Sequence, residues 1–194
     1  MRYMLSVVGL TVVLSTPAAS QVLSWEGIGP VRLGMTVKEA TRRLGAPFQP
    51  RDKLTFTSDM CWVTGRADGK DQTIQYVIVD GKISVINVFP SNGQTPRAVD
   101  THGIGVGSTE ADIRQAYGQV NRRLAPYFSE EDEIKAAAKA PTGPDGEPPR
   151  PPEYWVQVES SDRKRVMIFN TFEGRVTWMR SGLKPRVADI EDCI

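Results

Sequence analysis

Two stretches of this sequence decide its fold: residues 31–45 read VRLGMTVKEATRRLG, and residues 104–118 read IGVGSTEADIRQAYG. When the first is written above the second, the two glycines of the first stretch coincide with the last two of the second. The central threonine, the acid three positions after it and the apolar positions coincide as well. Self-similarity at a fixed spacing indicates one supersecondary unit used twice along the chain.

Each stretch predicts a short helix with a cap at both ends. Thr36 and Thr109 are typical N-cap residues, and the acid three positions later, Glu39 or Asp112, can bond back to the amide of the cap. A glycine closes each stretch and suits the left-handed conformation that ends many helices. The two predicted helices therefore occupy the same positions of the two units.

Strand patterns follow each helix. Asp80-Gly81 stands between two apolar runs, which is typical of a tight hairpin, and Glu173-Gly174 occupies the same place in the second unit. Three antiparallel strands are predicted in each unit, at 61–64, 73–79 and 83–88 in the first and at 154–159, 165–171 and 176–180 in the second.

These patterns predict an α+β fold. We expect two tandem helix–antiparallel-meander units, at about 27–90 and 101–181, with a joined sheet and the helices on one face. The other face of the sheet is expected to stay partly open. Trp62 and Trp155 stand at the same place in the two units, which predicts a shared position in the core.

A jump in the spacing of the repeat marks an insertion in the second unit, at 129–152. It opens with an acidic run, Glu130 to Glu133, and ends in a stretch rich in proline. Because proline lacks the amide that a strand needs, that end predicts extended chain, whereas Ser129 and the acids after it predict a short capped helix. Residues 182–194 follow the second unit as a C-terminal tail.

The N-terminus has the pattern of a secretory signal peptide, residues 1–20. Arg2 supplies a positive charge, an apolar run follows, and small residues at Ala18 and Ser20 suit cleavage before Gln21, with cleavage after Ala18 as a close alternative. An uncleaved anchor or a buried first helix is the other interpretation. We expect a periplasmic or secreted protein without a lipid anchor, because no cysteine stands at the cleavage point.

Charge and cysteine content narrow the function further. The chain carries 24 Lys and Arg against 23 Asp and Glu, and loss of residues 1–20 removes Arg2 and no acid, which leaves a net charge of zero. A neutral single domain is not expected to hold nucleic acid or an anionic membrane by bulk electrostatics. Cys61 and Cys193 are expected to form a disulfide that pins the tail; a redox-active pair is the alternative, without a Cys-x-x-Cys motif to support it.

Residues that could carry catalysis or bind a metal are few. The chain has one histidine, His102, no Gly-x-Ser-x-Gly motif, and no calcium-loop spacing in its acidic run. We therefore expect no catalytic residues, no metal and no cofactor. An envelope hydrolase that acts on peptidoglycan or lipid through Glu39, Asp112 and Glu173 is one alternative, and a purely structural envelope component is another.

Trp178 is the leading candidate for contact with a partner, since the first unit has Val85 at the same place. Alternation along a strand puts Arg180 on the same face as Trp178. Gln157 and Arg165 are the other candidate partner-binding residues of the open face. Ordinary packing of the sheet is the alternative interpretation of all four.

A helix opened by Gly-x-Thr, closed by Leu-Gly or Tyr-Gly and followed by a β-meander resembles the tandem-repeat scaffold of β-lactamase inhibitory protein and the single-repeat SmpA/OmlA outer-membrane lipoproteins. The order of five motifs also resembles a family of uncharacterised exported bacterial proteins. These motifs are GPVRLGMT at 29–36, Cys61, Asp80-Gly81-Lys82-Ile83, THGIGVG at 101–107 and Asp192-Cys193.

The resemblance implies a scaffold and an extracytoplasmic compartment. In the inhibitory protein the concave sheet face grips an enzyme, whereas the SmpA/OmlA proteins are lipid-anchored parts of outer-membrane assembly. This chain lacks the lipid-bearing cysteine of the second group, and the enzyme-gripping residues of the first do not map onto it. We therefore expect a non-catalytic binding module, inhibitor-like or an envelope accessory, whose partner is an envelope or secreted protein. A β-lactamase as the target is not supported.

Overall fold

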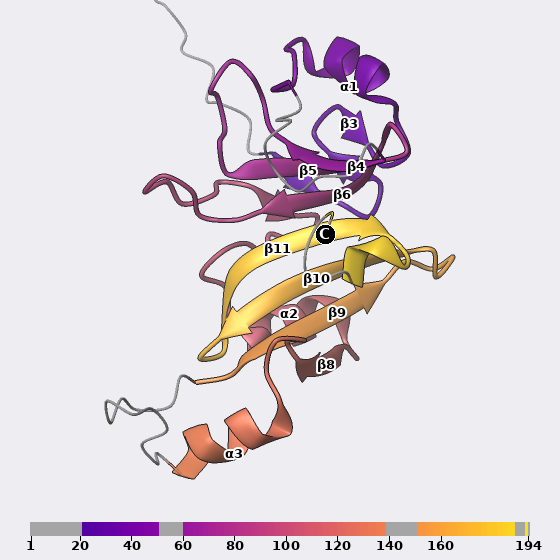
Figure 1. Ribbon diagram of the computed structural model, residues 1–194. Helices are drawn as coiled ribbons and strands as arrows, with labels where there is room; N and C mark the ends of the chain where they lie inside the picture. Colours follow the sequence, from indigo (N-terminus) through magenta and orange to yellow (C-terminus); the bar gives the residue numbers. More distant parts are fainter. Residues whose placement is uncertain (1–20, 51–59, 139–150, 189–192, 194) are drawn as a thin grey trace, which may run out of the picture.

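A computed structural model describes residues 21–50, 60–138, 151–188 and 193. The predicted signal peptide, 1–20, and residues 139–150 of the proline-rich insertion lie outside the described residues. The described chain has the expected α+β fold, with three α-helices, a four-stranded mixed sheet and a seven-stranded antiparallel sheet (Figure 1).

The large sheet contains both predicted meanders. The first consists of β4 (Cys61–Thr64), β5 (Ile74–Val79) and β6 (Lys82–Val88). The second consists of β9 (Glu153–Glu159), β10 (Arg165–Phe172) and β11 (Arg175–Leu183), with β8 (Asn121–Leu124) added at its edge. The strand order is β4-β5-β6-β11-β10-β9-β8, so the meanders meet where β6 pairs with β11.

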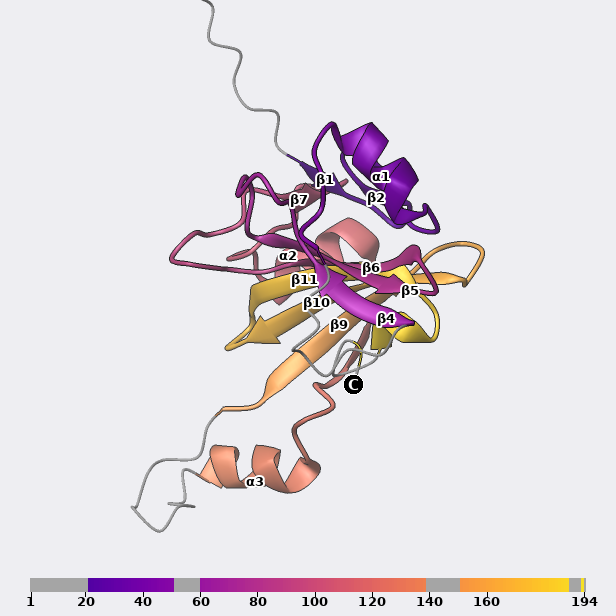
Figure 2. The same ribbon diagram turned by 45° about the horizontal axis from the view of Figure 1, so that its top comes forward.

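A second, separate sheet corrects the prediction of one joined sheet (Figure 2). Its strands have two residues each: β1 (Val22–Leu23), β2 (Gly27–Ile28), β3 (Val31–Arg32) and β7 (Val99–Asp100). β1 pairs in parallel with β7, which brings the segment before the first unit beside the segment that links the units. Strands this short carry no alternating pattern, so periodicity in the sequence does not reveal them.

The helices begin and end where the caps predict. α1 (Val37–Leu44) follows Thr36, whose side chain accepts a hydrogen bond from the Glu39 amide while the Glu39 carboxylate accepts one from the Thr36 amide. α2 (Glu110–Tyr117) has the same reciprocal bonds at its own cap. In the insertion, α3 (Glu130–Ala138) starts from Ser129, as its acidic first turn predicts.

The two units dock each helix start on its hairpin with the same backbone hydrogen bonds. In the first unit, the amide of Gly34 donates to the carbonyl of Ile83 (2.7 Å), and that of Val37 to Gly81 (3.3 Å). In the second unit, Gly107 donates to Val176 (2.8 Å) and Glu110 to Gly174 (2.9 Å). Helix and hairpin therefore form one repeated unit in three dimensions.

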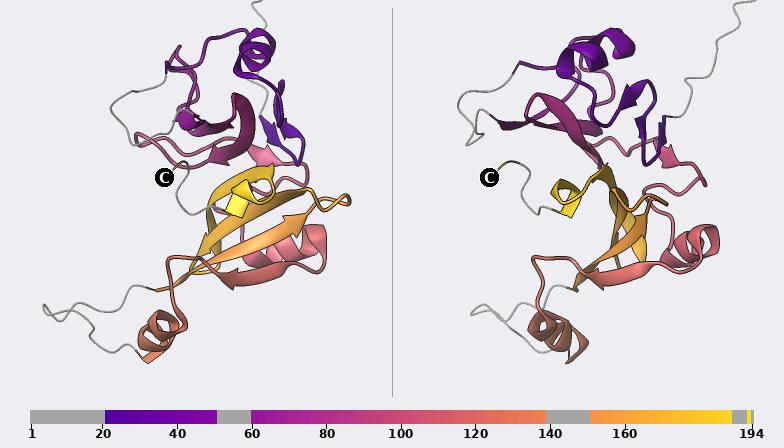
Figure 3. Two further views of the ribbon diagram at one scale, coloured as in Figure 1. Left: turned by 45° about the vertical axis from the view of Figure 1, so that its right-hand side comes forward. Right: turned by 90° about the vertical axis from the view of Figure 1, so that its right-hand side faces the viewer.

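The two faces of the large sheet have different covers. On the helix face, Ala40 of α1 and Ile113 of α2 join a core that also includes residues of the small sheet. The other side, here called the tail face, bears a second cluster that includes Val187 of the 3-10 turn (Arg186–Ala188) and Cys193. Figure 3 shows α2 and the 3-10 turn on opposite sides of the sheet. Val187 and Cys193 of the C-terminal tail thus pack on the face that the sequence predicts to be open.

The shared core position predicted for the two tryptophans is wrong. Both hairpins carry an irregularity at the same place of the repeat, between Val77 and Ile78 and between Asn170 and Thr171. The first strand of each meander, β4 or β9, pairs with the middle strand in a register that differs by one residue between the units. Trp62 lies opposite Ile78, whereas Trp155 lies opposite Asn170, the equivalent of Val77. Because side chains alternate between faces, Trp62 packs on the helix face and Trp155 on the tail face.

Candidate functional site

Three of the four predicted partner-binding residues share the tail face. Trp178 and Arg180 lie on β11, and Gln157 lies in the same row of the sheet as Arg180. Arg165 lies on the same side of β10 as Phe169, which is buried in the core of the helix face. This corrects the prediction that Arg165 completes one surface with Trp178, because residues an even number apart on a strand point to the same side.

Two tryptophans and two arginines form a continuous row across the second unit. Arg123 on β8 lies over the ring of Trp155 on β9, with its guanidinium carbon 5.2 Å from the ring centroid. Trp155 meets Trp178 edge to face, at 5.9 Å between centroids and 84° between planes. Arg180 then lies 5.2 Å from the Trp178 ring. This arginine–tryptophan row combines an aromatic pair with two cation–π contacts.

A buried polar network lies beside the two tryptophans of the row. Asn170, opposite both tryptophans in the sheet, is fully buried and donates to the Glu153 carboxylate (2.7 Å) and the Thr177 hydroxyl (2.8 Å). The bulge in β11 turns Thr177 to this side, against simple alternation. The hydroxyl of Tyr127 also donates to Glu153 (2.6 Å). Shared hydrogen bonds of this kind hold the neighbouring rings in one arrangement.

Arg180 lies between the Trp178 ring and the C-terminal turn. Its side chain is buried, and Nη1 donates to the carbonyl of Val187 at 3.4 Å. Val187 is itself almost fully buried. Arg180 is therefore covered by the protein's own C-terminal turn, whereas Trp178 and Gln157 stay partly exposed.

Arg123 is the exposed cation of the row. With the Gln157 amide turned so that its oxygen faces Arg123, that oxygen accepts from both Nε and Nη2 of the guanidinium at 3.0 Å. Among the described residues no carboxylate forms an ion pair with Arg123. The indole N–H of Trp155, buried below it, likewise meets no acceptor in the described part of the chain. The row thus offers a partner the exposed Arg123 guanidinium, whose charge no carboxylate among the described residues neutralises.

Arg123 and Tyr127 are the residues that the sequence analysis missed. Asn121-Arg-Arg-Leu124 shows no alternation of apolar and polar residues, so β8 has no strand signal. Tyr127 lies between that strand and α3, and it is 47% exposed. The adjacent pair of arginines just after a capped helix is the one signal in the sequence that points to this edge.

The carboxylates of the hydrolase alternative have other roles. Glu39 and Asp112 are exposed, and hydrogen bonds from Thr36 and Thr109 lower the pKa of each. Glu173 is exposed in the β10–β11 turn. None of the three lies in a buried acid pair among the described residues, and no group of three or more His, Cys, Asp or Glu there could hold a metal ion.

His102 lies against α2, away from the row. Its ring lies tilted by 59° against the ring of Tyr117, with 4.5 Å between the centroids. Burial and a hydrogen bond to Asp100 raise the pKa of Tyr117. His102 and Ser108 line one shallow cavity of about 540 Å³. The Ser108 hydroxyl accepts from the Gly105 amide, so it stabilises the turn before the helix.

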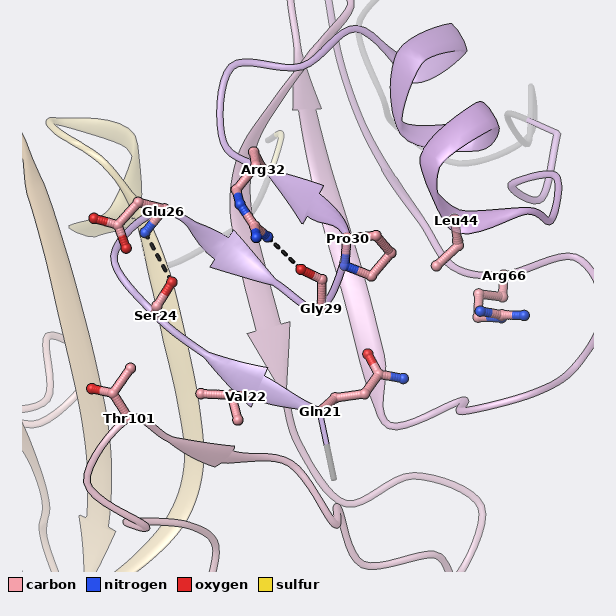
Figure 4. A pocket seen from close by; sticks show the side chains of 10 residues that line it. All are labelled: Gln21, Val22, Ser24, Glu26, Gly29, Pro30, Arg32, Leu44, Arg66 and Thr101. Carbon is pink, nitrogen blue, oxygen red and sulfur yellow. Dashed lines mark hydrogen bonds between the residues drawn. The ribbon is translucent and has the colours of Figure 1, made fainter. Parts of the chain in front are cut away.

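A larger cavity, of about 690 Å³, lies beside the small sheet (Figure 4). Its cations are satisfied locally: Arg32 donates to the Gly29 carbonyl, and Arg66 forms two hydrogen bonds with Asp68. The Asp68 contact raises the pKa of Arg66. This cavity therefore presents no convergent charge to a ligand. Its lining consists of Gln21, Val22, Ser24, Glu26, Gly29, Pro30, Arg32, Leu44, Arg66 and Thr101.

No family model, curated protein or solved structure matches this chain. The resemblance to β-lactamase inhibitory protein and to the SmpA/OmlA lipoproteins therefore stays a prediction.

Proposed function

We propose that this protein is an exported, non-catalytic binding module, periplasmic or secreted, that holds an envelope or secreted protein at the arginine–tryptophan row. One observation carries the proposal: Trp178 is partly exposed and held edge-on against Trp155, where the first unit has only Val85. Tryptophan and arginine are the residues most enriched among those that dominate binding energy at protein interfaces. A rigid pair of them is suited to a specific contact.

The chain's crosslink supports the proposed compartment. Cys61 and Cys193 form a disulfide, which suggests an oxidising location outside the cytoplasm. Among the described residues no helix is long and apolar enough to cross a membrane. The zero net charge expected after removal of 1–20 favours a protein partner over a polyanion. An inhibitor-like protein and an envelope accessory both fit this description.

The two other candidate functions draw less support. A hydrolase would need an acid and a base positioned at one site. The carboxylates of Glu39 and Asp112 instead accept hydrogen bonds from the helix N-caps of two separate units. A purely structural envelope component would leave unexplained why the second unit has the partly exposed Trp178 where the first unit has Val85. Of the three candidate functions, only a binding module explains Trp178 and Arg123, as residues that contact a partner.

Exchange of Trp178 for the residue of the other unit tests the proposal. The tagged mature protein and its Trp178→Val variant are used to capture proteins from the producing cell's envelope extract, and captured proteins are identified by mass spectrometry. A Trp62→Val variant is the matched control, since it makes the same exchange on the helix face. We expect a specific partner to be retained by the wild type and the control and lost from Trp178→Val, with unchanged circular dichroism.

Two results would contradict the proposal. One is equal capture by Trp178→Val and wild type. The other is no specific partner together with measurable turnover of a cell-wall or lipid substrate, which would favour the hydrolase.

A further inference from the structure

β8 is the last strand of the large sheet, and its outer edge has no partner strand in the described part of the chain (Figures 1 and 3). The amide of Ala125 donates to the carbonyl of Glu153 at 2.9 Å, so this pair is hydrogen-bonded across the strands. Hydrogen-bonded pairs alternate with non-hydrogen-bonded pairs along an antiparallel ladder, so the pair of Arg123 and Trp155 is hydrogen-bonded as well. The backbone N–H and C=O groups of Arg123 therefore point inward to β9. The backbone N–H and C=O groups of Arg122 and Leu124 therefore point outward from the sheet.

The arginine side chains of β8 leave this edge accessible. Natural proteins protect a free edge with charged side chains that obstruct an approaching strand. Here both guanidinium groups lie back over the neighbouring strand: Arg122 lies 3.3 Å from the centroid of the Tyr154 ring, and Arg123 lies over Trp155. The outward backbone groups are left free to bond to another chain.

The two arginines differ in charge balance. Arg122 forms an ion pair with the buried Glu110 at 2.9 Å. Arg123 has no such carboxylate among the described residues, and its closest polar contact is the neutral amide of Gln157. A side chain opposite Arg123 on an added strand would come within about 5 Å at the Cβ atoms, close enough for an ion pair.

We propose that the edge of β8 accepts an extended segment of the partner protein as an eighth strand, with an acidic side chain facing Arg123. This inference rests on the proposed function, because the edge and the arginine–tryptophan row share Arg123. The segment is short, since Pro126 has no amide to continue the ladder beyond β8. A second copy of this chain is the wrong occupant, because it would bring its own arginine pair against Arg122 and Arg123.

Amide hydrogen exchange of the isotope-labelled mature protein tests the proposal, with the blocked peptide acetyl-Thr-Val-Glu-Val-Thr-amide as the probe at millimolar concentration. We expect exchange at the amides of Arg122 and Leu124 to slow about fivefold to tenfold, the effect of one added hydrogen bond. The inward amides of Arg123 and Ala125 are expected to be protected with or without the probe. A probe with Lys in place of Glu and one with N-methylated backbone amides are the controls, and neither should slow exchange.

The Arg123→Gln variant separates charge from strand pairing. It is expected to keep the fold and to lose the preference for the Glu probe over the Lys probe. Unchanged exchange at Arg122 and Leu124 with the Glu probe, equal protection by the two probes on the wild type, or a dimer in sedimentation that buries these amides would each overturn the strand addition. If partner capture still depends on Trp178 in that case, the proposed function stands and only this mode of binding fails.

Discussion

Cys193 is bonded to Cys61 across 132 positions of sequence, with 5.1 Å between their Cα atoms. Cys61 lies on the edge strand β4, and the turn that precedes Cys193 buries Val187 and Arg180 on the tail face. The disulfide therefore anchors the segment that covers the sheet. Val187 and Cys193 of the tail pack on the hydrophobic cluster of that face.

Loss of this crosslink should destabilise the protein strongly. We expect the Cys61→Ser/Cys193→Ser double variant to lose about 5 kcal/mol of unfolding free energy, because a loop of this length is no longer closed in the unfolded chain. Urea denaturation of the variant and of the wild type with and without reductant measures the loss. Reduced wild type should match the variant, and an unchanged midpoint in both would show that the tail contributes little.

Gly182 lies where the tail meets β11, and an added methyl group would strain that contact. A Cβ at this position would lie 2.9 Å from the Ser84 carbonyl oxygen and 3.0 Å from Cβ of Val187. We expect Gly182→Ala to cost about 1–3 kcal/mol of unfolding free energy, as in other overpacked cores. Gly65→Ala is the control, because its nearest contact is at 3.7 Å. Equal midpoints for the two variants in thermal or urea unfolding would contradict the close contact.

Glu110 attaches α2 to the sheet through buried charge. Its carboxylate accepts from Arg114 (2.8 Å), Arg122 (2.9 Å) and the Thr171 hydroxyl (2.7 Å). We expect Glu110→Gln to lower the unfolding free energy by about 2 kcal/mol, since hydrogen bonds between charged groups are lost where water does not replace them. Glu131→Gln breaks the exposed pair with Lys135 and should change stability by less than about 0.5 kcal/mol. Urea denaturation compares the two variants. An equal effect on unfolding free energy would contradict the proposed contribution of the Glu110 hydrogen bonds.

The capping box of α1 predicts a dependence of stability on pH. Hydrogen bonds from Thr36 lower the pKa of Glu39 below its ordinary value of 4.5. Because the folded-state pKa is the lower one, the stabilisation is complete above 4.5 and is lost as the pH falls through the folded-state value. Wild type should therefore exceed Glu39→Gln in unfolding free energy at neutral pH, and the gap should narrow in acid. A gap that stays constant between about pH 7 and about pH 3 would contradict the capping role.

Local chemistry alone was enough to predict the helices and the hairpins, whereas the disulfide was predicted from the even number of cysteines and the expected export. Thr36 and Thr109, each with an acid three positions later, define a helix start through contacts within one turn. Asp80-Gly81 and Glu173-Gly174 define tight turns through the backbone conformations that they allow, with positive φ at all four residues. Such signals survive in a bare sequence because the interacting atoms are only a few residues apart.

Long-range packing decided the rest. The two-residue strands of the small sheet exist because β1 and β7, far apart in the chain, pair with each other. The shifted pairing beside the bulge, which places Trp62 and Trp155 on opposite faces, depends on a register between strands that sequence similarity does not report. The tail over Arg180 and the placement of Arg123 above Trp155 depend on the same three-dimensional neighbours. The sequence by itself therefore determined the repeated unit and its crosslink, and the tertiary structure decided which face is covered and where the candidate site lies, because burial is a property of assembled elements and not of any one of them.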